Sequence, residues 1–340
     1  MNSAYCWKIV QYRKPCIQLK KFAWQSNSFA FFDNKLFDVG ASIGLAYFGP
    51  DTKNVLDVLS AADLACNMAK ERGGNRVHVY DAADQETAHH EAQMHWVSQI
   101  NSALEEDRFR IYRQTIQNIQ DPGNDEQHYE VLLRLQGEDG RVVSPFHFIP
   151  AAERYGLMSK LDRWVVNRTL TKMAEIFARN PDGQLSCSIN LSGQSFCEDG
   201  FIDYIVSEID ASQVPTSRIC FEITETAAVS NLSQAVEFMR ALKEIGCRFS
   251  LDDFGSGMSS FTYLKNLPVD YLKIDGYFVK TMLENNIDHA MVASINQIGH
   301  VMGLKTIAEF VENDALLSEL QAMGVDYAQG YGIGKPEPFL

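Results

Sequence analysis

Polar side chains that can bind a cation or a phosphate stand at the ends of a succession of short apolar runs between Tyr129 and Tyr331. These side chains belong to Glu130, Asn190, Glu222, Asp252 with Asp253, Lys273, Glu309 and Gln329. Successive members lie roughly twenty to sixty residues apart, the length of one or two strand-helix units. A barrel of such units gathers the carboxyl ends of its strands around one mouth. The spacing therefore predicts one site assembled from many strands.

Strand-like runs alternate with helical patterns after residue 106. The eight expected strands are Phe109–Ile116, Tyr129–Leu135, Leu185–Leu191, Ile219–Glu225, Arg248–Asp253, Tyr271–Asp275, Lys305–Glu309 and Tyr327–Tyr331. Amphipathic helices are expected at Leu161–Ala178, Ser233–Ile245, Asp288–Met302 and Asn313–Met323. This alternation predicts an α/β fold, a modified TIM-like (β/α)8 barrel. Only the loop 117–128 joins the first two strands, and a parallel crossover needs about a dozen residues or more. An antiparallel first strand therefore stays open as an alternative.

The amino-terminal part of the chain is too short for a separate complete domain. From Lys35 to Tyr80 the pattern predicts strand, turn, helix and strand, with Phe37–Ala46 β-like and Val55–Lys70 helical. The first thirty residues show no steady period and are left unassigned. A polar helical stretch, 84–106, is expected to connect this part to the barrel.

Bulk composition limits the partners and the compartment. The chain has 340 residues, 46% of them apolar, and a net charge of −14. That charge argues against binding to nucleic-acid polymers, which requires a basic surface. The seven cysteines are scattered without a Cys-x-x-Cys pair, which favours free thiols in a reducing compartment. No run is long enough for a membrane segment or a signal-peptide core, so a cytoplasmic location is expected.

The donor atoms of the predicted site suit hard cations such as Mg²⁺ or Mn²⁺. One ion can be bound by three carboxylates and one amide carbonyl, which belong to Glu130, Asn190, Glu222 and Asp252. A second ion is within reach of Asp253 if Asp252 bridges the two. Consecutive strand residues face opposite ways, but the glycines at 255 and 257 would let the chain turn there.

Two divalent ions close together can activate one water and neutralise charge on a phosphate. Lys273 is then suited to orient that water or to stabilise the developing charge. Glu309 is suited to act as general base or as a ligand of the second metal, and the sequence leaves this division open. A single inward glutamate at a strand end is more often a satisfied polar group, but so many on separate strand ends favour a metal site.

The motif set resembles that of the EAL-domain cyclic di-GMP phosphodiesterases over about residues 92–340. The matching segments are Glu130-Val-Leu-Leu-Arg134, Ile189-Asn-Leu-Ser192, Phe221-Glu-Ile-Thr-Glu225, Leu251–Ser260, Leu272-Lys-Ile-Asp275, Ala308-Glu309 and Gln329-Gly-Tyr331 with Pro336. The resemblance implies hydrolysis of cyclic di-GMP to linear pGpG. The signature tripeptide has Val131 in place of alanine, a change that removes no ligand.

The resemblance also assigns residues around the metal site. It implies that Glu130, Lys273 and Glu309 take part in catalysis. It implies substrate contacts from Arg134, Gln329 and Asp275, although Gly276 occupies the place of an arginine that follows in the family. It further implies that Glu225 and the loop 252–260, with Gly255 and Ser259, order the metal site and take part in homodimer contacts. By itself, an arginine such as Arg134 is commonly solvated or ion-paired.

Residues 1–83 resemble a shortened GGDEF domain. The matching segments are Val39–Leu45, Ala62–Ala65, Ala69-Lys70 and Gly73–Val77, which are similar to the closing third of that domain. The GGDEF signature itself does not occur upstream, so cyclase activity is not expected. Two alternatives to hydrolysis stay open for the whole chain: a receptor that binds cyclic di-GMP with weak or absent catalysis, and an inactive, poorly folding fragment.

Overall fold

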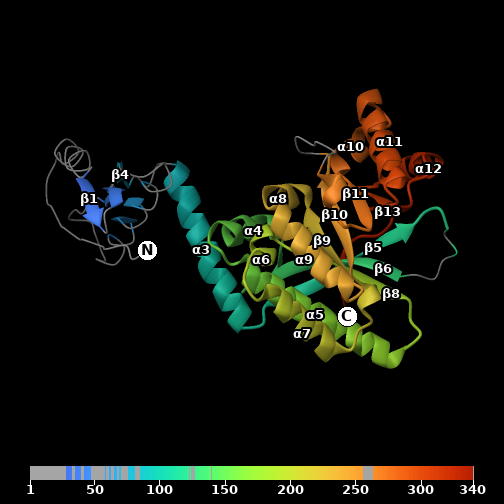
Figure 1. The fold of residues 1–340 in the computed structure, drawn as a ribbon, viewed down its shortest axis with the longest axis horizontal. Coiled ribbons are helices and arrows are strands. Elements are labelled where there is room, and N and C mark those ends of the chain that lie inside the picture. The colour runs from blue at the N-terminus through green and yellow to red at the C-terminus, as the bar shows by residue number, and fades with distance from the viewer. Residues whose placement is uncertain are drawn as a thin grey trace. The chain divides into compact units, whose positions relative to one another are not determined.

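The computed structural model describes residues 28–32, 35–39, 42–46, 58, 61–62, 65–66, 69, 76–80, 85–121, 123, 127–138, 140–255 and 263–339. The chain divides into two compact units, Met1–Trp96 and Val97–Leu340. The larger unit contains the strands β5 to β13 and the helices around them (Figure 1).

Eight strands form a closed barrel in the larger unit. They are β5 (Phe109–Asn118), β6 (Gln127–Gln136), β8 (Leu185–Asn190), β9 (Ile219–Thr224), β10 (Arg248–Phe254), β11 (Tyr271–Ile274), β12 (Lys305–Ala308) and β13 (Tyr327–Gln329). They pair in the order β5-β13-β12-β11-β10-β9-β8-β6, and β6 pairs again with β5, which closes the sheet. Each expected strand corresponds to one of these, so the predicted TIM-like barrel is confirmed.

The first barrel strand runs against all the others. β5 pairs antiparallel with both β6 and β13, whereas the pairs from β6 round to β13 are parallel. Antiparallel neighbours can be joined by a hairpin, which needs no crossover helix. The antiparallel alternative that the loop length left open is therefore the observed one.

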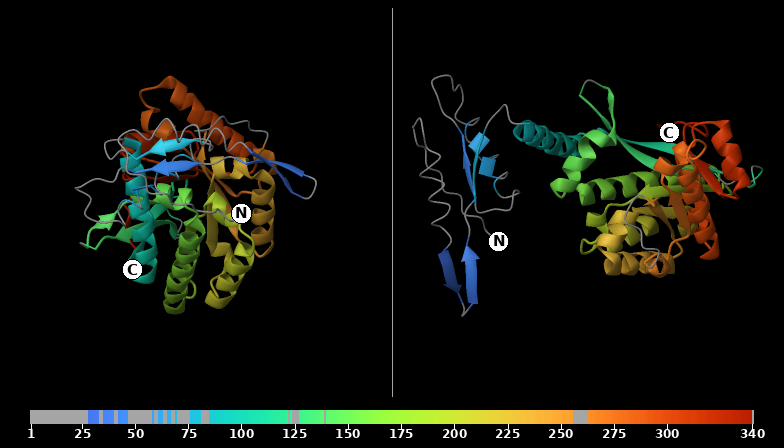
Figure 2. Two further views of the ribbon diagram at one scale, coloured as in Figure 1. Left: turned by 90° about the vertical axis from the view of Figure 1, so that its left-hand side faces the viewer. Right: turned by 90° about the horizontal axis from the view of Figure 1, so that it is seen from above.

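Helices cover the outside of the barrel (Figures 1 and 2). The longer ones are α5 (Met158–Arg179), α7 (Phe201–Ser212), α9 (Leu232–Glu244), α11 (Asn286–Val301) and α12 (Asp314–Ala322). Shorter elements are α4 (Pro145–Arg154), α6 (Gly193–Phe196), α8 (Glu225–Ser230), α10 (Gly276–Thr281), β7 (Val142–Val143) and β14 (Glu337–Pro338). The four helices expected from the sequence are present. The sequence analysis did not assign α7, although its buried residues Phe201, Ile205 and Ile209 have helical spacing.

The barrel interior has an aromatic floor. His128, Tyr271 and Tyr327 meet there, with ring centroids 5.6 to 6.2 Å apart. Burial lowers the pKa of His128 to about 3, so its ring is neutral, and its Nε2 lies 3.0 Å from the Ser188 hydroxyl. Each of the three rings precedes a polar residue by two positions on its strand. Side chains two residues apart point to the same face, so the polar residues form the next layer toward the barrel mouth.

The amino-terminal unit contains two small sheets. β1 (Ser28–Phe32) pairs antiparallel with β2 (Lys35–Val39), and β3 (Ile43–Leu45) pairs parallel with β4 (Val77–Val79). β1 falls largely in the stretch that the sequence left unassigned. The single β-like run expected at 37–46 is instead divided between β2 and β3. The described residues between 58 and 69 are helical, and the expected connecting helix is α3 (Gln85–Glu105).

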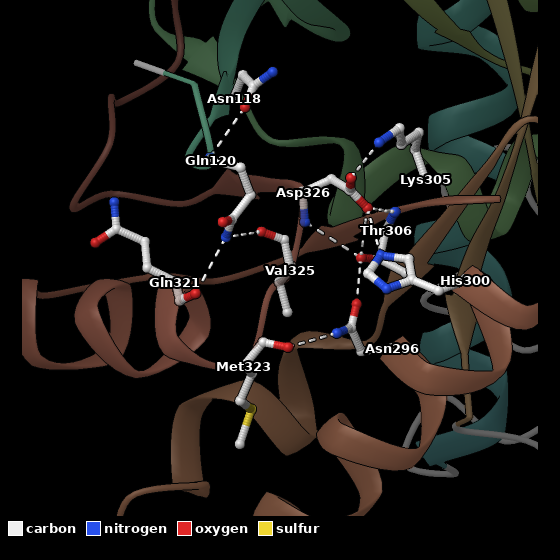
Figure 3. A network of polar contacts seen from close by, with 10 residues as sticks. All are labelled: Asn118, Gln120, Asn296, His300, Lys305, Thr306, Gln321, Met323, Val325 and Asp326. Carbon is white, nitrogen blue, oxygen red and sulfur yellow. Dashed lines mark hydrogen bonds and ion pairs between the residues drawn. The ribbon is translucent and has the colours of Figure 1, made fainter. Parts of the chain in front are cut away.

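A polar network joins the amino-terminal ends of β12 and β13 to α11 (Figure 3). Asp326, which precedes β13, accepts hydrogen bonds from Lys305 Nζ at 2.6 Å and from the Thr306 backbone N–H at 3.0 Å. His300 Nε2 lies 2.8 Å from the same carboxylate. Thr306 in turn donates to Asn296 Oδ1 at 2.6 Å, which links β12 to α11. One buried carboxylate therefore joins two strands and a helix.

Replacement of Asp326 by alanine should lower the free energy of unfolding by about 1–3 kcal/mol at pH 7, because it leaves the buried Thr306 N–H without an acceptor and removes the charged partner of the partly exposed Lys305 and His300. Burial opposes ionisation, but Lys305, the Thr306 amide and His300 lower the pKa of Asp326 below 3.8. Its stabilising contribution is therefore present above that pH and is lost as the pH falls further. Urea unfolding of wild type and D326A across this range measures both effects. Glu244→Ala, at an exposed position on α9, is the control and should change little.

Candidate active site

Each barrel strand supplies a polar side chain to one layer at the mouth. The layer comprises Gln114, Glu130, Asn190, Glu222, Asp252, Lys273, Glu309 and Gln329. The register places Gln114 opposite Glu130 and Asn190 opposite Glu222. Seven of these residues were expected to converge from the sequence, and the structure brings them together. Gln114 was not among the expected residues, although the period of two along 109–118 could have indicated it.

Lys273 lies at the centre of this layer, with its side chain only 1% exposed. Its Nζ is 2.8 Å from Glu309 Oε1, 2.9 Å from Glu222 Oε2, 3.0 Å from Asp252 Oδ1 and 3.6 Å from Glu130 Oε2. Burial works against the charged lysine, but the surrounding carboxylates outweigh it and raise the pKa of Lys273 well above its usual value. One ammonium therefore faces four carboxylates, and the centre remains deficient in positive charge.

Two amides fix the orientation of Glu130. Asn190 Nδ2 donates to Glu130 Oε1 at 2.7 Å, and Gln329 Nε2 donates to Glu130 Oε2 at 2.6 Å. Gln329 Nε2 also lies 3.2 Å from Gln114 Oε1. Burial alone would raise the pKa of Glu130, but Lys273 and the two amides outweigh burial and lower it. Glu130 is therefore a carboxylate, and the amide oxygen of Asn190 is left as the atom that can bind a cation.

Other carboxyl groups in the layer, and Asp253 beside it, resist ionisation. Burial raises the pKa of Glu222 to about 8, and burial with the neighbouring Asp252 raises the pKa of Asp253 to about 6. Burial also raises the pKa of Glu309 well above its usual value. Among the described residues, Glu222 Oε1 and Gln329 Oε1 are buried oxygens without a hydrogen-bond partner. An additional cation in the layer would satisfy the oxygen of Glu222 and lower these pKa values.

Asp252, Asp253 and Glu309 form the tightest group of possible metal ligands. One oxygen from each lies within 4.8 Å of the others. Adjacent strand residues can share a face here because the pairing of β10 with β11 shifts register between Leu251 and Phe254, and Asp253 has φ 55°. The sequence analysis placed this turn at the following glycines. Gly255 does have φ 102°, but the change of direction begins at Asp253, and residue 257 lies outside the described residues.

The donor set fits divalent cations. Glu130, Glu222, Asp252 and Glu309 lie around Lys273 Nζ. Asn190 is hydrogen-bonded to Glu130, and Asp253 lies beside Asp252 and Glu309. All of these offer oxygen atoms, which Mg²⁺ and Mn²⁺ prefer. The buried unpartnered oxygen and the raised pKa values are further signs that the group is built to hold more positive charge than Lys273 provides.

Two expected substrate contacts, Arg134 and Asp275, also have structural roles. Arg134, on β6 beyond Glu130, is half-buried, with its guanidinium 5.5 Å from the centre of the Tyr112 ring and Nη1 bonded to the Leu133 carbonyl at 2.8 Å. Asp275 caps α10 by accepting a hydrogen bond from the Tyr277 N–H at 2.8 Å. Arg134 lies four residues beyond Glu130 on β6, and Asp275 directly follows β11.

Gly276 occupies the place where the family pattern has an arginine, and the structure leaves no room for a side chain there. A Cβ at this position would lie 1.7 Å from Phe310 Cδ2. Phe310 itself has φ 50°, an uncommon backbone conformation for a bulky residue. The ring of Phe310 therefore fills the space beside Gly276, and no contact equivalent to the arginine can form.

Glu225 ties together the two ends of the segment that follows β10. Its Oε2 accepts a hydrogen bond from the Gly255 N–H at 3.0 Å, and its Oε1 accepts one from the Tyr263 hydroxyl. Glu225 is buried at the start of α8. Ser259, expected to belong to this loop, lies outside the described residues. Tyr263 could not be predicted to contact Glu225, because a loop tyrosine has no periodic pattern around it.

Fold and site together define a TIM-like barrel protein with an acidic, oxygen-rich mouth around one buried lysine. Residues 79–336 match the family described as EAL domain, and the chain belongs to this family.

Named relatives match most of this chain. The chain is 42% identical over 303 residues to cyclic di-GMP phosphodiesterase PdeB of Shewanella oneidensis, covering 89% of this chain and 35% of PdeB. It is 36% identical over 244 residues to cyclic di-GMP phosphodiesterase PdeF of Escherichia coli, covering 72% of this chain and 32% of PdeF. The chain thus spans about a third of the length of these curated relatives.

A solved structure has the same barrel. The crystal structure of the FimX EAL domain from Pseudomonas aeruginosa bound to c-di-GMP aligns with a TM-score of 0.66 at 30% identity. The alignment covers 72% of this chain and 97% of that domain.

Among the described helices, none has both the length and the apolar character needed to cross a membrane.

Replacement of Lys273 by methionine should lower the free energy of unfolding by about 3–5 kcal/mol at neutral pH in the presence of EDTA, because it leaves buried carboxylates without their counter-ion. The folded variant then binds protons more tightly than the unfolded chain, so its deficit should shrink as the pH falls from about 8 to about 5. Denaturant unfolding over this range tests the expectation. The matched control is Lys243→Met, which removes a partly exposed partner of Asp270. An equal loss in both variants would contradict a special role for the buried ammonium.

Proposed function

We propose that this chain is a phosphodiesterase that hydrolyses cyclic di-GMP to linear pGpG with two divalent ions, Mg²⁺ or Mn²⁺. The observation that carries the proposal is the gathering of four carboxylates around Lys273 Nζ within 3.6 Å. The names of PdeB and PdeF and the ligand of the FimX EAL domain support cyclic di-GMP as the substrate.

Cation binding is assigned to six residues. Glu130, Asn190, Glu222 and Asp252 would hold one ion, and Asp252, Asp253 and Glu309 would hold the second. When bound, divalent ions supply Lewis-acid stabilisation of charge on the phosphoryl oxygens. The aspartate turn at 252–253 allows both carboxylates to face the mouth.

The remaining polar groups act on the reacting atoms. A water oxygen attacks phosphorus, one ester P–O bond breaks, and the leaving 3′ oxygen takes a proton. Glu309 is the proposed general base for the water. Burial raises its pKa, and bound cations would lower that pKa again and leave the carboxylate ionised and able to accept a proton. Lys273 stabilises the negative charge that develops on the phosphate. Gln329, Arg134 and Asp275 are the proposed substrate contacts, with Arg134 offering two donors to a phosphate.

The proposal extends to the organisation of the protein. We propose that residues 1–83 are a GGDEF-like segment, an interpretation compatible with the parallel pair β3–β4 and the close packing of Gly44 against the backbone of Ala62 and Cys66. A homodimer formed through the EAL domain and a cytoplasmic location belong to the same proposal. Free thiols at the five described cysteines are consistent with a reducing compartment.

Replacement of Glu130 by alanine should lower hydrolysis of cyclic di-GMP by about 100-fold or more, because loss of cation binding removes several kcal/mol of charge stabilisation and each 1.4 kcal/mol is tenfold in rate. Separation of products by ion-exchange chromatography, with Mg²⁺ and separately with Mn²⁺, measures the formation of pGpG. Glu319→Ala, which removes a surface partner of His289, is the control and should retain activity.

Wild-type protein that forms no linear dinucleotide with either metal would contradict the proposed hydrolysis. Tight binding of cyclic di-GMP without turnover, unchanged in E130A, would instead identify a receptor. EDTA should abolish turnover and an excess of Mn²⁺ should restore it.

A further inference from the structure

We propose that Asp162 is a positioning residue that holds the cation ligand Asn190 in place from the outer layer of the barrel. The inference rests on the proposed function, because it assigns Asn190 to a cation site. Asp162 belongs to α5, and its side chain plays no part in the site described above. It is nevertheless only 4% exposed.

The hydrogen bonds of Asp162 go to the turn that leaves β8. Its Oδ2 accepts from the Ser192 backbone N–H at 2.9 Å and from the Ser195 hydroxyl at 2.5 Å. Ser192 caps α6, with its own Oγ accepting from the Ser195 N–H at 3.3 Å. Asp162 therefore fixes the first turn of α6, and that turn begins two residues after Asn190.

The other side of the same turn is fixed by β9. The Leu191 N–H donates to the Glu222 carbonyl at 2.9 Å, and Asn190 lies opposite Glu222 in the sheet. Residues 190–192 are thus held between a strand of the barrel and a buried carboxylate of α5. Asn190 is the last residue of β8 and reaches Glu130 through its side-chain amide. Its backbone orientation depends on both anchors.

Burial of the Asp162 carboxylate costs free energy, which its hydrogen bonds to Ser192 and Ser195 must offset. Among the described residues, no lysine or arginine forms an ion pair with Asp162. Burial raises the pKa of Asp162 to about 6, which reflects the cost of a buried charge. A charged acceptor, however, makes hydrogen bonds about twice as strong as a neutral one. Outer residues that orient metal ligands commonly change metal affinity or activity by about 10–100-fold when they are replaced.

The test compares Asp162→Ala, Asp162→Asn and Ser195→Ala in the full chain. Mn²⁺ binding without substrate is measured by electron paramagnetic resonance, and kcat and KM for cyclic di-GMP are measured separately. D162A should weaken Mn²⁺ binding by about tenfold and lower kcat, with KM changed by less than about twofold. D162N keeps an acceptor and should show a smaller loss. Glu175→Ala, on an exposed face of the same helix, is the matched control.

Unchanged Mn²⁺ affinity in a folded D162A protein, or an equal loss in E175A, would overturn the inference. If D162A does not fold, S195A decides, because it removes only one donor to Asp162 and should weaken Mn²⁺ binding by about threefold. Wild-type protein that binds Mn²⁺ without hydrolysis would contradict the proposed function alone. Normal hydrolysis together with unchanged binding in D162A and S195A would contradict this inference alone.

Discussion

The ammonium group of Lys273 is the interaction on which the architecture of the mouth depends. Four carboxylates approach within 3.6 Å of it, and at such distances buried like charges repel strongly unless a cation lies between them. Lysine supplies one positive charge on a flexible stem that can reach all four. The residual excess of carboxylate explains why the pKa values of Glu222 and Glu309 are raised. The layer is therefore stable enough to fold and still attracts further positive charge.

Barrel closure is what gives this interaction its geometry. On β6, β11 and β13, an aromatic floor residue precedes a polar mouth residue by two positions, as His128 precedes Glu130 and Tyr271 precedes Lys273. The antiparallel β5 obeys the same rule in reverse, since buried Ile116 follows Gln114. Two residues along the strand therefore separate the packed aromatic floor from the polar layer at the mouth. The floor keeps water from below, and this strengthens the electrostatic interactions above it.

Much of this arrangement could be predicted from the sequence, because strand alternation and polar residues at strand ends are local patterns. The eight strands, the antiparallel first strand as an alternative and the convergence of Glu130 with Glu222 all follow from such patterns. Features that arise from tertiary packing could not be predicted. Asp253 turns toward the mouth through its own left-handed backbone rather than through the glycines that follow. The Phe310 ring fills the space beside Gly276, a contact between segments more than thirty residues apart.

Acidic side chains at the two ends of the barrel have different roles: one stabilises the fold, and the other is available to bind a cation. At the amino-terminal end, Asp326 is paired with Lys305 and hydrogen-bonded to the Thr306 amide, so its pKa is lowered and its charge stabilises the fold. At the mouth, Glu222 has a buried oxygen without a partner and a raised pKa, so its charge opposes the fold. Both are acids at strand ends in the same sheet, and only their partners differ. Asp326, whose hydrogen bonds are satisfied, stabilises the fold, whereas Glu222, which is not fully satisfied, retains the capacity to bind a cation. The barrel tolerates the unfavourable charge of Glu222 because interactions such as those of Asp326 stabilise it elsewhere.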